Sequence, residues 1–201
     1  MKKWIFFLGL LPLLAVTGFA QESRQDISMS FLGTFQPKVT GNAITQTSTI
    51  GIGDLIEYRF MLNPSNALEA NYSYSQFTQK YISSGGGSPT ARIHTRYEEF
   101  SAEYVRSFTF KRFNPFVGVG AGEFFYRPID DTHTTTNKAG GSSSIEEILG
   151  GGIAYEVSPS WDLRVEYRGT LTKASSFGLP NYNTNRYYII QQPAIGIAYH
   201  F

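Results

Sequence analysis

Residues 193–201 read Pro-Ala-Ile-Gly-Ile-Ala-Tyr-His-Phe, and this stretch decides the fold of the chain. From Ile195 onward, every second residue is apolar or aromatic, ending at Phe201, and small or polar residues lie between them. A two-residue period of this kind is typical of a β-strand with one apolar face. The alternation therefore predicts a strand whose apolar face contacts either hydrocarbon or a protein core.

The same stretch resembles the C-terminal assembly signal of bacterial outer-membrane β-barrels. In that family a glycine is followed three positions later by an aromatic residue and two positions after that by a terminal aromatic residue. Gly196, Tyr199 and Phe201 fit this spacing, although Ala194 stands where the family often has a small polar residue. The resemblance implies that the barrel-assembly machinery recognises these three residues during biogenesis.

The beginning of the chain is typical of a secretory signal peptide. Lys2 and Lys3 precede an apolar stretch over residues 4–16, and Gly18-Phe19-Ala20 comes directly before Gln21. This stretch is too short and wrongly flanked for a stable membrane span, which leaves an uncleaved anchor as the less favoured alternative. We therefore predict cleavage between Ala20 and Gln21, a signal peptide over residues 1–20 and one barrel domain over residues 21–201.

The composition of residues 21–201 narrows the possible functions. Without Lys2 and Lys3 the chain has 15 basic and 16 acidic residues, so no excess of positive charge suggests nucleic acid as a partner. Cysteine is absent, which rules out disulfides as a source of stability. No later segment approaches the roughly 18 consecutive apolar residues of a transmembrane helix. If this part of the chain crosses a membrane, it crosses as strands.

The two-residue alternation recurs along the chain. With the last strand, at about residues 186–201, we count eight predicted strands, the others lying near residues 27–36, 50–62, 68–75, 97–110, 115–127, 146–157 and 161–171. Short turns are predicted at residues 63–66, 111–114 and 158–160, and longer polar connections at residues 37–49, 80–91, 128–144 and 172–185. Asp54 falls on the apolar side of the second strand, which predicts a bulge or a strand start near Leu55.

The order of short and long connections separates two kinds of barrel. A soluble eight-stranded barrel of the lipocalin type has its apolar positions inside and no reason for every second connection to be long. A transmembrane barrel has apolar residues outside, short periplasmic turns and long extracellular loops. Three short and four long connections match the second kind. Unpaired backbone groups cost several kcal/mol in hydrocarbon, so the last strand must also pair with the first.

We therefore predict an all-β fold, an eight-stranded antiparallel up-and-down transmembrane β-barrel. Aromatic residues near strand ends fit the two interfacial girdles of such barrels. The predicted girdle residues are Phe60, Tyr74, Phe108, Phe110, Phe125, Tyr126, Trp161, Tyr187, Tyr199 and Phe201.

The polar alternate positions should line a narrow interior that side chains can fill. Carboxylates and guanidinium groups enclosed there are expected to form a hydrogen-bonded ionic network with bridging waters, which we favour over a proton path or a conducting pore. The predicted members are Glu57, Arg59, Glu69, Glu99, Glu103, Glu156, Asp162, Arg164, Glu166 and Arg168. Glycines at residues 118–122 and 150–152 are expected to mark sheet bends or to leave room for these side chains.

Residues 21–201 as a whole resemble the outer-membrane β-barrel family that includes OmpX, the N-terminal domain of OmpA and opacity-type surface proteins. The resemblance rests on the signal peptide, the short turns, residues 161–168 and the terminal residues 196–201. It implies a monomer in the bacterial outer membrane, in contact with membrane lipid and lipopolysaccharide. Because these motifs are architectural, they imply little about activity.

Two classes of function remain open. The first is a structural or surface-interaction protein that acts through its four extracellular loops on a ligand that the sequence does not identify. The second is a small transport element, either a narrow pore or an OmpW-like conduit for apolar molecules. The crowded, charged interior favours the first class.

A lipid A-modifying enzyme is less favoured. Its deacylase type resembles a serine hydrolase with a His-x-Ser pair, and none of His94, His133 and His200 begins such a pair. His133 lies close to Asp130 and Asp131, but one histidine beside two adjacent carboxylates lacks the spaced ligand set of a specific metal site. We therefore predict a solvated loop there, and no catalytic, cofactor-binding or metal-binding residue.

Overall fold

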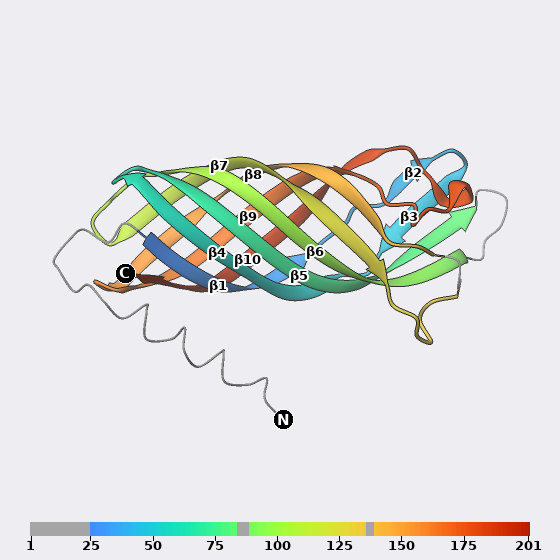
Figure 1. Cartoon of the computed structure of the whole chain (residues 1–201), viewed down its shortest axis with the longest axis horizontal. Helices are drawn as coiled ribbons and strands as arrows, with labels where there is room; N and C mark the ends of the chain where they lie inside the picture. The colour runs from blue at the N-terminus through green and yellow to red at the C-terminus, as the bar shows by residue number, and fades with distance from the viewer. Residues whose placement is uncertain (1–24, 84–88, 136–138) are drawn as a thin grey trace, which may run out of the picture.

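The strands close on themselves into one antiparallel barrel (Figure 1). The computed structural model describes residues 25–83, 89–135 and 139–201. Neighbouring strands of the barrel pair in chain order, and β5 also pairs with β6, which completes the ring of eight. The barrel strands are β1 (Gln25–Thr34), β4 (Gly51–Asn63), β5 (Asn66–Ser83), β6 (Pro89–Ser107), β7 (Phe113–Pro128), β8 (Ser142–Ser158), β9 (Trp161–Lys173) and β10 (Tyr187–His200). The predicted fold class is confirmed, while Ala20 and Gln21 lie outside the described residues.

The first and last strands form the closing seam. β1 pairs with β10 from Asp26 opposite His200 to Leu32 opposite Ala194, and the Phe201 N–H donates to the Gln25 carbonyl oxygen at 3.1 Å. Closure matters because a sheet edge has no water to bond to within a bilayer. The described part of the chain contains no helix long and apolar enough to cross a membrane.

The three short connections lie at one end of the barrel, which we call the turn end. They leave residues 64–65, 108–112 and 159–160 outside the strands, and the C-terminus lies at this end in Figure 1. All three turns form where the sequence predicted short connections, but the middle one begins three residues earlier than the predicted 111–114, because β6 ends at Ser107. The middle turn is closed by a bridge between Phe110 and Phe113, and Lys111 within it has a positive φ of 59°.

The opposite end, which we call the loop end, contains more sheet than the sequence predicted. Residues 80–91 were expected to form a loop, but β5 and β6 extend to 18 and 19 residues and occupy most of that range. Residues 37–49 were also expected to form a loop, but they contain a hairpin of β2 (Val39–Gly41) and β3 (Ile44–Ser48), and β3 pairs with the upper part of β5. The last connection contains the 3₁₀-helix η2 (Pro180–Tyr182).

The bulge predicted near Leu55 does not form. β4 pairs with β1 without a register shift from Gly51 to Phe60, so Asp54 keeps its place in the ladder opposite Phe31 and points outward. Two flanking strands fix this register, and a one-residue slip would move every side chain of β4 to the wrong face.

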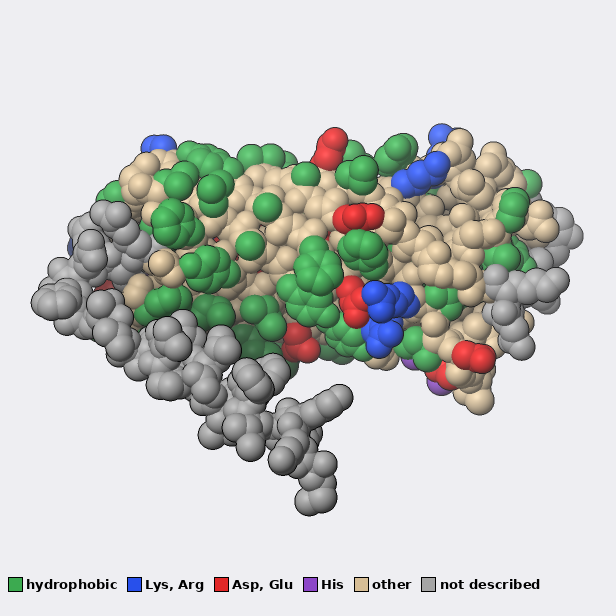
Figure 2. Space-filling model, in the orientation of Figure 1, with side chains coloured by type: hydrophobic (Ala, Val, Ile, Leu, Met, Phe, Trp, Pro, Cys, Tyr) green, Lys and Arg blue, Asp and Glu red, His purple; other side chains and the backbone are tan. Residues whose placement is uncertain are grey.

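The outer wall of the barrel is apolar. On β9, Leu163 is 42% exposed and the adjacent Arg164 is 1% exposed, which shows that apolar residues face outward and charged residues inward. Figure 2 shows hydrophobic side chains spread over the wall between the two ends of the barrel. A few acidic side chains, among them Asp54 and Glu147, lie at outward positions. An apolar surface of this extent is unusual for a protein surrounded by water and normal for one surrounded by lipid.

Candidate functional site

The interior nearest the turn end is built around Arg164 of β9. Its guanidinium group lies 3.1 Å from Glu57 Oε2 and 3.3 Å from Asp26 Oδ1, and it also donates to the Ser28 hydroxyl at 3.1 Å. Ser28 donates in turn to Glu57. All four side chains are buried. Their convergence follows from pairing, because β1 lies between β4 and β10, and β10 lies next to β9.

A second guanidinium extends this group across the barrel. Arg59 Nη2 and Nε lie 2.6 and 2.7 Å from Glu69 Oε2, and Arg164 lies 3.7 Å from the same oxygen. Both guanidinium groups stack over the Phe116 ring, at 4.8 and 5.5 Å from its centroid. The Phe116 ring therefore makes a cation–π contact with each guanidinium group and orients both groups toward their carboxylates.

The third guanidinium, Arg168, forms the next layer. It lies 2.5 Å from Glu99 Oε1 and 2.9 Å from Glu103 Oε1, and Asn71 also donates to Glu103 at 2.8 Å. Glycines on β7 make room for these carboxylates: a Cβ added at Gly118 would lie 2.9 Å from Glu103 Oε2. A Cβ at Gly122 would lie 2.5 Å from the Phe100 carbonyl oxygen, which is too close for any side chain.

Most of the ten predicted network residues share this interior, but not all of them. Glu166 is buried among them, whereas Asp162 bonds instead to His200, with 3.0 Å between Asp162 Oδ2 and His200 Nε2. Glu156 is half-buried opposite Asp162, and none of the ion pairs among the described residues includes it. The sequence prediction did not include Asp26. This residue lies two positions before Ser28 on the same face of β1, so the two-residue alternation alone would have placed it inside the barrel.

The network contains more acid than base. The described interior buries eight carboxyl groups and three guanidinium groups. Among them is Glu146, whose two carboxylate oxygens have no hydrogen-bond partner in the part of the chain that the structure describes. Buried charges must be compensated, so some of these carboxyl groups must hold a proton or a bound cation.

Tyr97 lies at the boundary of the network on the side of the loop end. Its hydroxyl lies 3.0 Å from Ser73 Oγ and 3.3 Å from Glu99 Oε2, and Gln192 donates to the same hydroxyl. Gln192 accepts a hydrogen bond of 2.8 Å from Thr170. The other side of the Tyr97 ring contacts aromatic residues. Tyr97 therefore joins two parts of the interior with different chemistry.

Between Tyr97 and the loop end, the interior is apolar and aromatic. This aromatic cluster differs from the polar interior predicted from sequence, and Tyr126, predicted to lie in an outer girdle, is one of its buried members. Tyr97 packs against Phe124 with 4.9 Å between ring centroids and an interplanar angle of 68°. The cluster comprises Val39, Phe77, Tyr81, Ala91, Ile93, Tyr97, Phe124, Tyr126, Ala174, Phe177, Tyr188 and Ile190.

The last connection of the chain supplies the top of the aromatic cluster. Phe177 is fully buried and packs edge-on against Tyr81 and Tyr126, at centroid distances of 6.5 and 6.3 Å. Its positive φ of 52° is unusual for an aromatic residue and turns its side chain into the barrel. The Gly140 N–H donates to the Phe177 carbonyl oxygen at 2.9 Å. Residues 174–186 thus plug the loop end, and we call them the plug loop.

The hairpin of β2 and β3 braces the plug loop. The Asn42 side-chain amide donates to the Asn183 carbonyl oxygen at 2.9 Å, and a Cβ at Gly41 would overlap the Thr184 carbonyl oxygen at 2.1 Å. Within the network itself the packing is close: a cavity of about 10 Å³, lined in part by Glu69, Glu103 and Arg168, has room for at most about one water.

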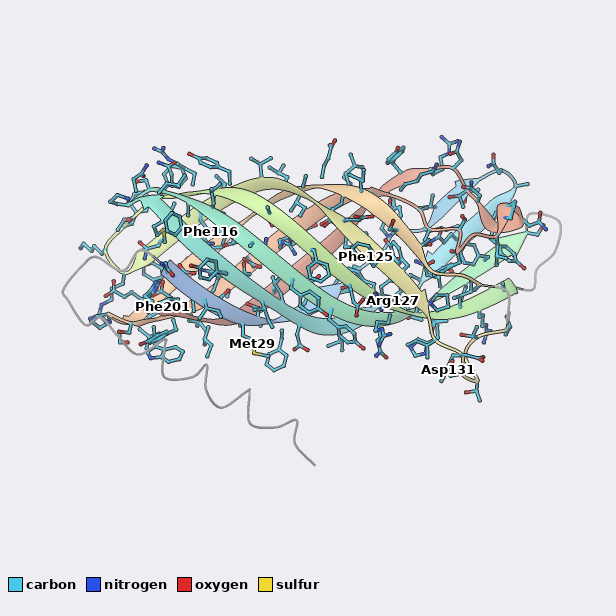
Figure 3. All side chains as sticks on the ribbon, in the orientation of Figure 1. Met29, Phe116, Phe125, Arg127, Asp131 and Phe201 are labelled. Carbon is cyan, nitrogen blue, oxygen red and sulfur yellow. The ribbon has the colours of Figure 1, made fainter. Side chains whose placement is uncertain are left out.

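The predicted assembly residues lie at the turn end of β10. Gly196 faces inward where a Cβ would lie 2.1 Å from the Met29 carbonyl oxygen, so the close approach of β1 requires glycine. Tyr199 faces outward and packs against Trp161, with 5.0 Å between centroids, and against Phe201, with 6.2 Å. Figure 3 shows Phe201 at this end of the barrel. Recognition of these residues during assembly stays a prediction.

Charged side chains follow the apolar band on the outer wall. Figure 3 places Phe125, Arg127 and Asp131 in that order toward the loop end. Arg127 Nε lies 3.4 Å from Glu98 Oε2, and Arg96 lies 4.0 Å from the other oxygen of Glu98. We call Arg96, Glu98 and Arg127 the charged collar.

The comparisons with known proteins agree with this architecture. No curated protein sequence matches the chain. Among solved structures it resembles neisserial surface protein A (NspA), with 14% identity, a TM-score of 0.61, and coverage of 89% of this chain and 98% of that one. It also resembles Ail of Yersinia pestis, with 13% identity, a TM-score of 0.55 and coverage of 90% and 100%. OprG of Pseudomonas aeruginosa gives 11% identity, a TM-score of 0.56 and coverage of 90% and 97%.

At these identities the solved structures show the fold alone, and the family comes from the sequence. Residues 6–201 match the family described as "Outer membrane protein beta-barrel domain", which covers nearly the whole chain. The closed barrel, its lipid-facing wall and this match lead to one conclusion: the chain belongs to the outer membrane protein β-barrel domain family and is an integral protein of the bacterial outer membrane.

Proposed function

We propose that this protein is a closed, monomeric surface protein of the outer membrane that binds partners at its loop end and neither conducts solutes nor catalyses a reaction. One observation carries the proposal: Phe177 of the plug loop is fully buried inside the barrel, above an interior that is already filled. By the general rule for outer-membrane barrels, short turns are periplasmic and long connections extracellular, so the plug faces the cell exterior.

The filled interior argues against a permanent pore. A solute would first meet the aromatic cluster and then the network, in which Arg168 lies 2.5 Å from Glu99 and Arg59 lies 2.6 Å from Glu69. An eight-stranded barrel has an interior only wide enough for side chains. Passage would therefore require these contacts to break, and breaking buried charge pairs is costly.

The loop end has the properties of a prepared binding surface. The β2–β3 hairpin adds to the sheet at β5, and hydrogen bonds from Asn42 and Gly140 fix the plug loop beside it. A surface ordered before binding loses less conformational entropy when a partner docks. Two structures with this fold support a surface role, since NspA is a surface protein and Ail has been crystallised with the heparin analogue sucrose octasulfate.

The charged collar suggests a second contact, with lipopolysaccharide. Figure 3 places Arg127 beyond Phe125 toward the loop end, and Arg96 pairs with the same Glu98. We place the phosphate-bearing headgroups of the outer leaflet at this depth. Guanidinium groups bind phosphate through paired hydrogen bonds. We propose that these arginines anchor the barrel at the outer leaflet.

The transport alternative leads to an opposite expectation. A narrow pore or a conduit for apolar molecules requires the plug loop to leave the barrel, and the likeness to OprG shows only that another outer membrane protein has the same fold. Planar-bilayer recordings of the native protein test this directly. We expect no channel activity, and steady single-channel openings at moderate voltage would overturn the proposal in favour of transport.

Binding at the loop end needs its own test. Residues 40–47 are replaced by a two-residue turn, and cells carrying this variant are compared with wild type for adhesion, serum survival and membrane integrity. Heat-shifted mobility on SDS gels shows whether the shortened barrel still folds. We expect reduced adhesion or serum survival with intact membranes. Equal behaviour of both strains, repeated for a variant in residues 129–135, would contradict a surface-binding role.

A further inference from the structure

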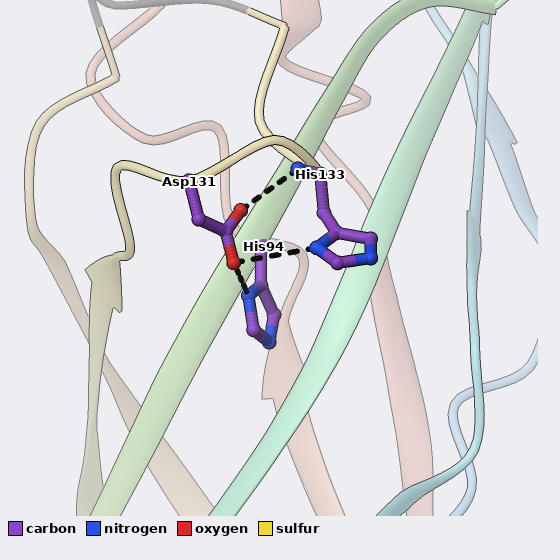
Figure 4. A group of neighbouring side chains, drawn as sticks. All are labelled: His94, Asp131 and His133. Carbon is purple, nitrogen blue, oxygen red and sulfur yellow. Dashed lines mark hydrogen bonds and ion pairs between the residues drawn. The ribbon is translucent and has the colours of Figure 1, made fainter.

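Three side chains with metal-binding atoms meet on the outer wall near the loop end (Figure 4). His94 Nδ1 lies 2.6 Å from Asp131 Oδ2, and His133 Nδ1 lies 3.4 Å from the same oxygen. His94 comes from β6, whereas Asp131 and His133 follow β7. The sequence predicted a solvated loop at residues 130–133, because it could not show that His94, nearly 40 positions away, completes a set of three.

The backbone holds these residues in place. The Ile129 N–H donates to the His94 carbonyl oxygen at 2.7 Å, and the Thr135 N–H donates to the Arg92 carbonyl oxygen at 2.9 Å. Residues 129–135 therefore lie along β6 beyond the end of β7. Asp131 is fixed further, because its Oδ1 accepts a hydrogen bond of 2.9 Å from the His133 N–H. The cluster is thus built from two segments, β6 and residues 129–135, which main-chain hydrogen bonds hold side by side.

The separations suit a metal ion. In tetrahedral coordination, bond lengths of about 2.0–2.2 Å place neighbouring ligand atoms roughly 3.3–3.6 Å apart. The His133–Asp131 separation of 3.4 Å already meets this spacing, and all three ligand atoms lie within 4.8 Å of one another. The His94–Asp131 separation of 2.6 Å has to lengthen by roughly 0.7–1 Å, which a side-chain rotation on the open face supplies.

We propose that His94, Asp131 and His133 form a binding site for one divalent first-row transition-metal ion of the Zn²⁺ or Cu²⁺ type. Two imidazole nitrogens and one carboxylate oxygen are borderline ligands that select such ions over Mg²⁺ and Ca²⁺, which prefer oxygen ligands. Three protein ligands leave at least one coordination position open for water or for a group of a partner.

The cluster is accessible and favours a cation. The side chains of His94, Asp131 and His133 are 21%, 31% and 69% exposed, so an ion can enter from the cell exterior. The Asp131 carboxylate carries a negative charge near neutral pH, as aspartates ordinarily do, and attracts a cation. An imidazole binds metal only in its neutral form, through the lone pair of the unprotonated ring nitrogen.

The test uses the full protein extracted from outer membranes without a polyhistidine tag, and Cu²⁺ and Zn²⁺ as probes. Calorimetry should show one Zn²⁺ bound per chain at pH 7.5, with Mg²⁺ showing no binding. His94→Gln, His133→Gln and Asp131→Asn should each weaken Zn²⁺ binding at least tenfold. Asp130→Asn, which removes an adjacent charge outside the cluster, and His200→Gln, which removes the histidine at the turn end, should leave it unchanged.

Electron paramagnetic resonance of the Cu²⁺ form gives an independent readout. The spectrum should show coupling to two imidazole nitrogens in the native protein and to one in either histidine variant. Heat-shifted mobility on SDS gels confirms that each variant is folded. The proposal is overturned if the folded native protein binds no Zn²⁺ or Cu²⁺, or if His94→Gln and His133→Gln keep the native affinity and spectrum. In that case the cluster only pins residues 129–135 to β6.

Discussion

The two halves of β5 place opposite chemistry on the same faces. Toward the turn end, Ser73 points into the barrel and Tyr72 points outward. Toward the loop end, Phe77 and Tyr81 point inward, while Lys80 lies on the outer face. The pairing of β5 with β6 is continuous from Asn66 to Tyr81, so no slip of register causes the change. The polarity of the strand reverses while its geometry does not.

The reversal marks where the surrounding medium changes. Within the bilayer the outer face must be apolar, and the enclosed polar side chains satisfy one another in the network. Above the bilayer the outer face meets water, so the strands are held together as in a soluble protein, by burying apolar residues inside. β6 changes in the same way, with Tyr97 inside and Arg96 outside, followed by Glu99 inside and Phe100 outside.

The network half depends most on Arg164, and its removal should have the largest effect. Arg164→Ala leaves Glu57 and Asp26 as buried carboxylates without their cation, which should lower the free energy of unfolding by about 3–5 kcal/mol. Urea unfolding in lipid vesicles measures this through Trp161, the only tryptophan in a chain that starts at Gln21. Arg112→Ala, at an exposed turn position, is the control. A loss below about 1 kcal/mol for Arg164→Ala would show that the network is not a major source of stability.

A lysine scan along the outer face of β5 should locate the boundary itself. Ala70→Lys places a charge in the apolar band and should cost roughly 2–4 kcal/mol, as charges near the bilayer midplane do in other barrels. Thr78→Lys makes the same change on the same face, but above the proposed boundary, and should cost less than about 0.5 kcal/mol. Equal costs in urea titrations would mean that the polarity reversal does not mark the membrane surface.

The reversal also explains which parts of the fold could be predicted from sequence. Apolar residues at every second position and three short turns were enough to find eight strands and their order. Residues 80–91 were interpreted as a loop, because the rule of apolar-outside strands fails above the membrane, where Tyr81 and Ile93 are the inward residues. Tyr126 was assigned to a girdle for the same reason. The depth of the membrane was the missing information.

The candidate sites were predictable to different degrees. Arg164 and Arg168 follow from strand parity alone, and parity would also have found Asp26. Glu156 lies on the inward face of its strand but near the end of β8, where the barrel opens to solvent. Strand parity alone therefore predicts more members of the network than the structure contains. The contact between His94 and Asp131 depends on how residues 129–135 fold along β6, and no periodic pattern in the sequence encodes that path.

Tyr97 connects the two halves, so removing its hydroxyl should have a moderate effect. Tyr97→Phe keeps the packing against Phe124 but removes a hydrogen-bond partner from Ser73 and Gln192, which should cost about 1–2 kcal/mol. Tyr167→Phe, on the lipid-facing wall, should cost less than about 0.5 kcal/mol in the same urea titration. If the two variants were equally stable, the hydroxyl of Tyr97 would contribute no link between the halves.

A substitution in the plug loop should have the smallest effect on the stability of the whole barrel and a large effect on the local stability of the loop. Phe177→Ala keeps the positive φ and removes only the buried ring, a change that costs about 3–5 kcal/mol in a cooperative core. The plug loop has no strand in the barrel ladder, so it should open by itself, and the urea midpoint of the barrel should shift by less than about 1 kcal/mol.

Hydrogen exchange at the Gly140 amide, which donates to the Phe177 carbonyl oxygen, isolates the local effect. We expect exchange to accelerate roughly 100-fold in Phe177→Ala, because the lost burial lowers the free energy of local opening. Tyr187→Ala removes a ring that is 69% exposed at the same end and should leave Gly140 unchanged. If Phe177→Ala instead lowered global stability by several kcal/mol with no separate change at Gly140, the plug loop and the barrel would unfold as one unit. The aromatic cluster would then stabilise the whole protein to the same degree as the network around Arg164.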